Sequence, residues 1–445
     1  MEQWLREQEA AARAQDAADD LRAMRSQFRV PRAGDIGGAG DGECVYLVGN
    51  SLGLQPIATR GAMEAELEDW ARLGVEAHFK GGHPWFSAHE EVRGMLSRVV
   101  GALPREVVAM NSLTTNLHLM MVSFYRPTRE RYKIVIEESA FPSDSYAVRS
   151  QADFHAPRAG FDASRAVVRL RPREGEATLR TSDVLDLLDR ERDTVALVML
   201  GGVNYLTGQL FDIRAITACA RARGMAVGWD LAHAAGNIDL RLHDDGPDFA
   251  AWCSYKYLNS GPGSIAGAFV HERHLHAGAG LPRFAGWWGN DPKERFRMGP
   301  DFRPVESADA WQLSNPPIFA LTPLRVSLEL FERATMPALR EKSRRLTGLL
   351  ERLIDERNAQ KPAAAVGVLT PRDQAQRGCQ LSLVLPGDAR GAFAALQARG
   401  VVCDFREPNV VRAAPVPLYS TFHDVWRFVA ALDDALGGAN AGGGL

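Results

Sequence analysis

An aspartate and a lysine stand out because each lies beside an apolar segment, where a charge is costly. Asp230 ends the run MAVGWD, and Lys256 lies among aromatic residues in WCSYKYLN. A carboxylate at the end of a buried strand needs a cationic partner. An ammonium group in poorly hydrated surroundings has a lowered pKa and becomes a usable nucleophile. Either residue alone is commonly a helix cap or an exposed side chain, so the pair is more informative than its members.

Together the two residues suit pyridoxal phosphate, which needs a lysine for its Schiff base and an anion beside its pyridinium nitrogen. Leu113 and Thr114 open a predicted helix, whose backbone N–H groups, dipole and hydroxyl group suit a phosphate. Phe141 is placed to stack on the ring, and His233 follows Asp230 by three residues. Alone, Thr114 would be interpreted as a cap, Phe141 as a core residue and His233 as a structural hydrogen-bonding group.

The elements that position these residues are short apolar runs that alternate with helix-like stretches. The runs cover 107–110, 132–137, 166–169, 194–200, 225–229, 248–253 and 265–270. Near-continuous apolar strands separated by helices predict an α/β fold with a mostly parallel sheet that is covered on both faces. Ligands of such sheets bind at the carboxyl ends of the strands, which is where the candidate residues lie.

The order of helix-like and strand-like stretches along the chain predicts a large domain and a smaller one. We expect an N-terminal helical segment over 1–44, with its helix over 3–28, and a large cofactor-binding α/β domain over 45–317. A smaller C-terminal α/β domain follows over 318–437. The Gly-rich tail 438–445 is predicted to be disordered.

Composition excludes several classes of protein. The 445 residues carry 52 basic and 55 acidic side chains, a net charge of −3, which gives no support to a nucleic-acid partner. No apolar run reaches the length of about 18 residues that spans a membrane, and the charged N-terminus is unlike a signal peptide. Five scattered cysteines are typical of reduced thiols, so we expect a cytoplasmic protein.

Three histidines alternate in HERHLH, at His271, His274 and His276. The spacing suggests a metal site, but the segment is polar, carries an arginine and precedes a Gly-rich loop. These features are typical of a solvated surface, and the sequence has no H-E-x-x-H motif. We therefore predict no metal site.

Several segments resemble kynureninases. They are YLVGNSLGLQP (46–56), NSLTTNLHLMMVSFYRPT (111–128), ESAFPSDSYAVRSQ (138–151), GWDLAHAAGN (228–237), WCSYKYLNSGPG (252–263), GWWG (286–289), LSNPPI (313–318) and VVCDFREPNVVRAAPVPLYSTFHDV (401–425). The resemblance spans about 45–430. It implies a homodimeric hydrolase of fold type I, dependent on pyridoxal phosphate, in tryptophan degradation. Such an enzyme cleaves L-kynurenine or 3-hydroxy-L-kynurenine to anthranilate, or its 3-hydroxy form, and L-alanine.

The resemblance also implies roles for individual residues. Lys256 matches the Schiff-base lysine, Asp230 the partner of the pyridinium nitrogen, and Arg412 the arginine that binds the substrate α-carboxylate. Tyr255 is our candidate for the general acid and base. Cofactor contacts are expected from Leu113, Thr114, Phe141, Pro142, Ser143, Asp144, His233 and Tyr255, and from Trp287 and Asn315 of the neighbouring subunit.

The substrate preference is predicted less directly. His78 and Asn315 resemble a polar pair associated with 3-hydroxykynurenine, and we expect both substrates to be accepted. Gly201-Gly202 departs from family members that have a hydroxyl-bearing residue there.

Another fold-type-I enzyme, such as a cysteine desulfurase or a class V aminotransferase, is the alternative. A desulfurase needs a mobile reactive cysteine, whereas Cys379 and Cys403 lie in apolar, strand-like contexts. A non-catalytic binding protein would lack the lysine or the carboxylate clamp, both of which are present.

Overall fold

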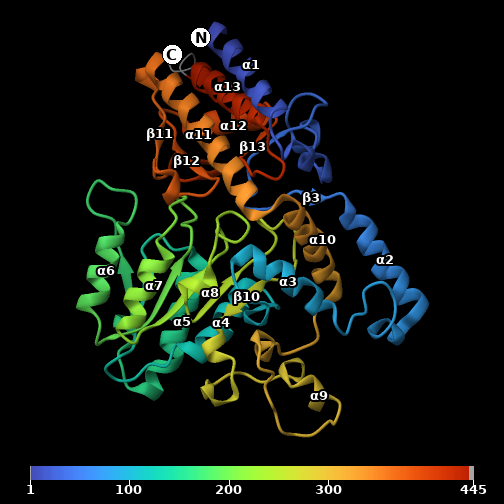
Figure 1. Cartoon of the computed structure of the whole chain (residues 1–445). Coiled ribbons are helices and arrows are strands. Elements are labelled where there is room, and N and C mark those ends of the chain that lie inside the picture. Colours follow the sequence, from blue (N-terminus) through green and yellow to red (C-terminus); the bar gives the residue numbers. More distant parts are fainter. Residues whose placement is uncertain (1, 440–445) are drawn as a thin grey trace.

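The computed structural model describes residues 2–439, and its larger part is built around a seven-stranded sheet (Figure 1). The strand order is β4-β10-β9-β8-β7-β5-β6. β10 runs antiparallel to β4 and β9, and the other pairs are parallel. The bounds are β4 Val107–Ala109, β5 Lys133–Glu137, β6 Val167–Leu170, β7 Val195–Gly201, β8 Ala226–Asp230, β9 Phe249–Trp252 and β10 Gly267–Val270. The predicted α/β fold with a mostly parallel sheet is confirmed.

Both faces of this sheet are buried, because successive strand residues point into two different cores. In β5, Val135 contributes to one core, while Ile134 and Ile136 contribute to the other. The first core contains side chains of α3, α6, α7 and α10, and the second contains those of α4 and α5. The bounds are α3 Ala88–Val100, α4 Leu113–Phe124, α5 Pro142–Ala159, α6 Thr181–Arg190, α7 Ile213–Ala222 and α10 Ile318–Ala334.

The smaller part has its own antiparallel sheet, with strand order β11-β12-β15-β14, and a third core. Its helices α11 and α12 pack with α13. The bounds are β11 Gly367–Val368, β12 Leu381–Val384, β14 Asp404–Arg406, β15 Val410–Ala413, α11 Met336–Gln360, α12 Ala389–Ala398 and α13 Phe422–Ala439. Of the tail predicted to be disordered, 438–439 end α13, and 440–445 lie outside the described residues.

Both ends of the chain build this smaller part (Figure 1). α1 (Glu2–Ala17) packs along α13, and β2 (Val45–Tyr46) pairs in parallel with β13 (Val401–Val402). In contrast, α10 packs on α3 and on α2 (Ala58–Leu73) of the larger part. A boundary at residue 317 would separate α10 from those helices, and a boundary at 44 would divide the N-terminal contribution to the smaller core.

The first helix is shorter than the predicted range 3–28. α1 ends at Ala17, and a separate 3-10 helix covers Arg22–Gln27. Between them, Asp19 is buried and pairs with the buried Lys342 at 2.8 Å, and its Oδ1 accepts a hydrogen bond from the Leu21 N–H. An aspartate that bonds to nearby backbone competes with the helix, which explains the interruption.

None of the helices of residues 2–439 is long and apolar enough to cross a bilayer.

Candidate active site

A cavity of about 370 Å³ opens where strands of the central sheet end and α4 and α5 begin. It unites ten of the predicted site residues, namely Leu113, Thr114, Phe141, Ser143, Asp144, Asp230, His233, Tyr255, Lys256 and Arg412. Asp230 is the last residue of β8, and Lys256 follows the end of β9 by four residues. The structure thus brings the predicted residues together where parallel strands end, which is the place where ligands of such sheets bind (the strand-end rule).

The amine of Lys256 is held beside a neutral imidazole. Its Nζ lies 3.1 Å from Nε2 of His233 and 5.9 Å from the ring centroid of Phe141. Burial, followed by the charge of Lys256, lowers the pKa of His233 well below its ordinary value. A neutral ring can accept a hydrogen bond from Nζ, and so it orients the amine without repelling it.

Two buried carboxyl groups, those of Asp144 and Asp230, line the cavity and interact with each other. Burial raises the pKa of both, and the negative charge of Asp230 raises that of Asp144 further. The hydrogen bond between them favours the charged form of Asp230 and the protonated form of Asp144. Asp230 also accepts a 2.7 Å hydrogen bond from the backbone N–H of Ala232. Asp230 is therefore the anion of the pair.

Two helix N-termini provide positive potential at the same cavity. Ser112 caps α4 and Phe141 caps α5, and neither makes a side-chain capping bond. The first backbone N–H groups of α4 are therefore left without a capping side chain, and in α5, which begins with Pro142, the first such N–H group belongs to Ser143. The hydroxyl groups of Thr114 and Ser143 lie 2.8 Å apart and join the two helix starts. This arrangement can bind a phosphate.

Arg412, in β15, reaches the cavity from the smaller part of the molecule. Its Nη1 donates a 2.6 Å hydrogen bond to the carbonyl oxygen of Tyr205, and its Nη2 contacts the carboxylate of Asp404. Only 2% of its side chain is exposed, and burial lowers its pKa to about 10. A fixed guanidinium that faces a cavity is suited to bind a carboxylate.

Several cavity residues are absent from the predicted set, and three of them, Glu137, Tyr205 and Arg406, carry chemically active side chains. Glu137 is the last residue of β5, so the strand-end rule could have found it. The ring centroid of Tyr205 lies 5.9 Å from Cζ of Arg406 and 5.8 Å from Cζ of Arg412. No local signal identifies Tyr205 or Arg406, because their positions depend on how the two parts of the chain meet.

The departure at Gly201-Gly202 has a steric explanation. The Gly201 N–H donates to Glu137, and a Cβ at Gly201 would lie 3.0 Å from Oε1 of that carboxylate. A Cβ at Gly202 would lie only 2.6 Å from a methyl carbon of Leu231. Both positions therefore favour glycine, because Glu137 and Leu231 fill the space of a side chain.

Four other predicted site residues do not line the cavity of their own chain. Pro142 is the exposed first residue of α5. His78 packs edge-on against Trp85, and Asn315 is exposed. The side chain of Trp287 is 41% exposed, and its indole N–H donates to the Arg295 carbonyl oxygen.

The donor set fits pyridoxal phosphate. It offers an amine, a buried anion, an aromatic ring and a phosphate cradle, and each matches a part of the cofactor. Within residues 2–439, the buried Nδ1 of His233 and Nε of Arg412 are left without a hydrogen-bond partner, and both belong to residues that line this cavity. The cysteines fit a desulfurase poorly, because Cys379 and Cys403 are buried, which raises the pKa of each thiol to about 12.

Known proteins share this architecture. The cysteine desulfurase CsdA from Escherichia coli superposes with a TM-score of 0.72 at 19% identity, covering 94% of this chain and 98% of that one. A cysteine desulfurase from Thermococcus onnurineus gives 0.70 at 18%, covering 89% and 95%. Residues 45–364 match the aminotransferase class-V family model. Fold and site thus define a pyridoxal-phosphate enzyme of the class V type.

More specific matches identify the branch. Residues 339–432 match the model of the kynureninase C-terminal domain. Kynureninases from Myxococcus xanthus and Salinispora tropica are 57% and 58% identical over 425 and 434 residues, which are 96% and 97% of this chain and 96% and 98% of those proteins. The chain belongs to the kynureninase family. It is a hydrolase that cleaves kynurenine, and its cofactor is pyridoxal phosphate.

Proposed function

We propose that kynurenine hydrolysis depends on three groups of this chain, namely the amine of Lys256, the carboxylate of Asp230 and the guanidinium of Arg412. The observation that carries this assignment is that the three side chains, from distant segments, line one cavity. When bound, pyridoxal phosphate supplies an electron sink for the electron pairs released from substrate carbon atoms.

Nζ of Lys256 would hold the cofactor in the absence of substrate. When it is free, Nζ would take the proton from Cα of the bound substrate. His233 keeps Nζ on the cavity side through the 3.1 Å contact. The charged Asp230 would keep the pyridine nitrogen of the cofactor protonated, and the protonated Asp144 donates a hydrogen bond to Asp230.

Arg412 binds the α-carboxylate and so fixes the orientation of the bond that breaks. Tyr255 acts as general acid and base while water adds to the side-chain carbonyl and the Cβ–Cγ bond breaks. Burial raises the pKa of the Tyr255 phenol, so the residue carries a proton at neutral pH and can donate it. Anthranilate, or its 3-hydroxy form, and alanine are the products.

The direct test compares product formation from L-kynurenine and 3-hydroxy-L-kynurenine, with and without added pyridoxal phosphate. We expect both substrates to be cleaved. Lys256→Ala should abolish the visible absorption of the lysine-linked cofactor and lower the rate by at least about 10⁴-fold, since it removes both the covalent attachment and the base. A variant that keeps this absorption would refute the assignment of Lys256.

We further propose a homodimer in which Trp287, Asn315 and His78 complete the site of the partner. The support is an aromatic cluster in which the exposed rings of Phe79, Trp287 and Phe296 contact the half-buried Phe86 and the buried Trp288. Phe79 is 62% and Phe296 is 56% exposed, which is typical of an interaction surface rather than of a solvated one.

The segments of the three residues gather at this surface. A Cβ at Gly286, next to Trp287, would lie 2.2 Å from the Leu313 carbonyl oxygen, two residues before Asn315. The His78 ring lies 6.3 Å from that of Phe79.

Mixed dimers test this arrangement. Refolding Lys256→Ala together with Trp287→Ala should restore about one quarter of the wild-type activity, because half of the dimers are hybrids with one intact site each. A fully active monomer in light scattering would contradict the proposal.

The five unpaired cysteines support a cytoplasmic location.

A further inference from the structure

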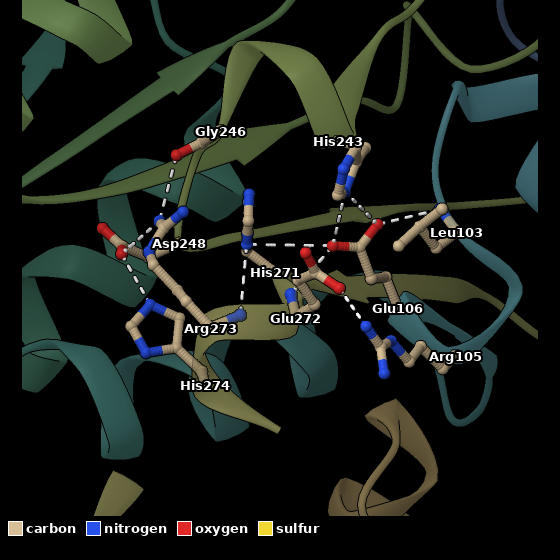
Figure 2. Close-up of polar contacts among 10 residues, drawn as sticks. All are labelled: Leu103, Arg105, Glu106, His243, Gly246, Asp248, His271, Glu272, Arg273 and His274. Atoms are coloured by element: carbon tan, nitrogen blue, oxygen red, sulfur yellow. Dashed lines mark hydrogen bonds and ion pairs between the residues drawn. The ribbon is translucent and has the colours of Figure 1, made fainter. Parts of the chain in front are cut away.

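A second cluster of chemically active side chains, Glu106, His243 and His271, lies at the end of the central sheet away from the cavity. Figure 2 shows its polar contacts. Glu106 directly precedes β4, His271 directly follows β10, and His243 lies in the short helix α8 (Leu242–Asp245). β10 is antiparallel to β9, so its end lies where β9 begins, whereas Lys256 follows the end of β9. The cluster is therefore separate from the active site.

Two histidines converge on the same carboxylate. Nδ1 of His243 lies 3.1 Å from Oε1 and 3.2 Å from Oε2 of Glu106, and Nδ1 of His271 lies 3.8 Å from Oε1. One ligand atom from each of the three residues lies within 4.8 Å of the other two. Three donors of this kind at this spacing can bind one metal ion after a small adjustment.

The carboxylate of Glu106 is built into the fold but lacks a permanent cation. The residue is 0% exposed, and its oxygens accept 2.8 Å hydrogen bonds from the backbone N–H groups of Leu103 and Glu272. No lysine or arginine of residues 2–439 forms an ion pair with it, since Arg105 pairs with Glu272 and Arg273 pairs with Asp248. A buried carboxylate needs a compensating positive charge.

We propose that Glu106, His243 and His271 bind a divalent transition metal ion, with zinc as the preferred ion. Two imidazoles and one carboxylate are a common zinc ligand set, and water can supply the fourth ligand because the His243 side chain is 32% exposed. The backbone hydrogen bonds to Glu106 provide the outer support that orients a metal-binding carboxylate.

The neighbouring histidines are engaged elsewhere. Nε2 of His274 lies 2.8 Å from Oδ1 of Asp248, which also accepts a hydrogen bond from Arg273 (Figure 2). His276 is exposed. The alternating histidines of HERHLH thus do not converge, and only His271 joins the cluster. Metal binding to Nδ1 of His271 would replace a long, 3.3 Å hydrogen bond from the Arg273 N–H, which is a weak contact.

The metal would join three segments that are far apart in the sequence, at residues 104–106, 242–245 and 271–274. Because these segments flank the sheet on the side away from Lys256, the ion would stabilise the fold and leave the chemistry unchanged. A metal that binds only the folded chain raises its thermal stability.

The test uses the holoenzyme made without a polyhistidine tag, freed of metal with a chelator and titrated with zinc chloride in a calorimeter. We expect one zinc ion per chain and a higher thermal midpoint on loading. His243→Gln and His271→Gln should weaken binding at least about tenfold. His274→Gln, three residues away, is the matched control and should bind zinc like the wild type. Kynurenine cleavage should be equal with and without zinc.

Absence of saturable zinc binding, or binding unchanged in both variants, would overturn the proposal. A second measurement does not depend on the folding of a variant. When the wild type is loaded with cobalt in place of zinc, the visible absorption bands of the metal should be those of a site with nitrogen and oxygen ligands. A thiolate charge-transfer band would instead assign the metal to a cysteine and reject the site.

Discussion

Oδ2 of Asp404 contacts Nη2 of Arg412 and lies 3.1 Å from Nη2 of Arg406. Both arginines line the active-site cavity. Asp404 therefore orients the guanidinium of Arg412, whose Nη1 is held by the Tyr205 carbonyl oxygen. A side chain held on two sides loses little conformational freedom when it binds a substrate carboxylate.

Asp404→Asn should weaken substrate binding without slowing the chemical step. Because a hydrogen bond to a charged group contributes roughly 1.5–3 kcal/mol, we expect KM for kynurenine to rise about tenfold or more while kcat changes little. Steady-state kinetics measure both constants. Glu407→Gln, which removes an exposed carboxylate three residues away, is the control. An unchanged KM in Asp404→Asn would contradict the positioning role.

Thr114→Val should weaken cofactor binding selectively. The variant removes the hydroxyl group that joins the two helix starts, and one lost hydrogen bond to a phosphate lowers the affinity about tenfold. Titration of the cofactor-free protein with pyridoxal phosphate, followed by visible absorption, measures the change. Thr115→Val is the control, because its hydroxyl pairs with Ser112 and it does not line the cavity. Equal affinities in the two variants would exclude a phosphate contact of Thr114.

Glu137→Gln should stabilise the cofactor-free protein at alkaline pH. Burial raises the pKa of Glu137 from 4.5 to about 7, so between these values the folded state holds a proton that the unfolded state has released. The free energy of unfolding then falls as the pH rises through this window, and the loss is complete above about pH 7. Glutamine stays neutral and avoids the loss, up to about 3 kcal/mol.

Thermal midpoints of Glu137→Gln and the wild type should therefore be similar below pH 4.5 and differ most at pH 8. Glu138→Gln, at the neighbouring and exposed position, should show no such trend. A gain that is equal at all pH values would show that titration of Glu137 is not its cause.

His78→Ala should change substrate preference if His78 reaches the site of the partner. Loss of one hydrogen bond to the ring hydroxyl should lower kcat/KM for 3-hydroxykynurenine about tenfold, with a small effect on kynurenine. His83→Ala, whose ring pairs with Glu91 nearby, is the matched control. A parallel loss for both substrates would assign His78 a structural role.

Local sequence determined the elements and the residues at their ends. Apolar runs predicted the strands of the central sheet, and charges beside those runs identified Lys256 and Asp230, because burial of a charge is costly wherever the chain folds. Glu137 is also a charged residue at the end of an apolar run, so the same reasoning could have identified it as a site residue from the sequence. The start of α4 was predictable for a similar reason, since residues at a helix N-terminus have local preferences.

Tertiary structure decided which distant residues meet. The contact of Asp404 with Arg412 depends on the pairing of β14 with β15, and that of Arg412 with Tyr205 on the docking of the two parts of the molecule. His271 reaches Glu106 because β4 and β10 pair as neighbours, and His243 does so because α8 lies against the end of α3, where its N–H donates to the Gly101 carbonyl oxygen. Hydrophobic periodicity is a property of consecutive residues, whereas these contacts depend on strand order and domain packing, which no single segment encodes.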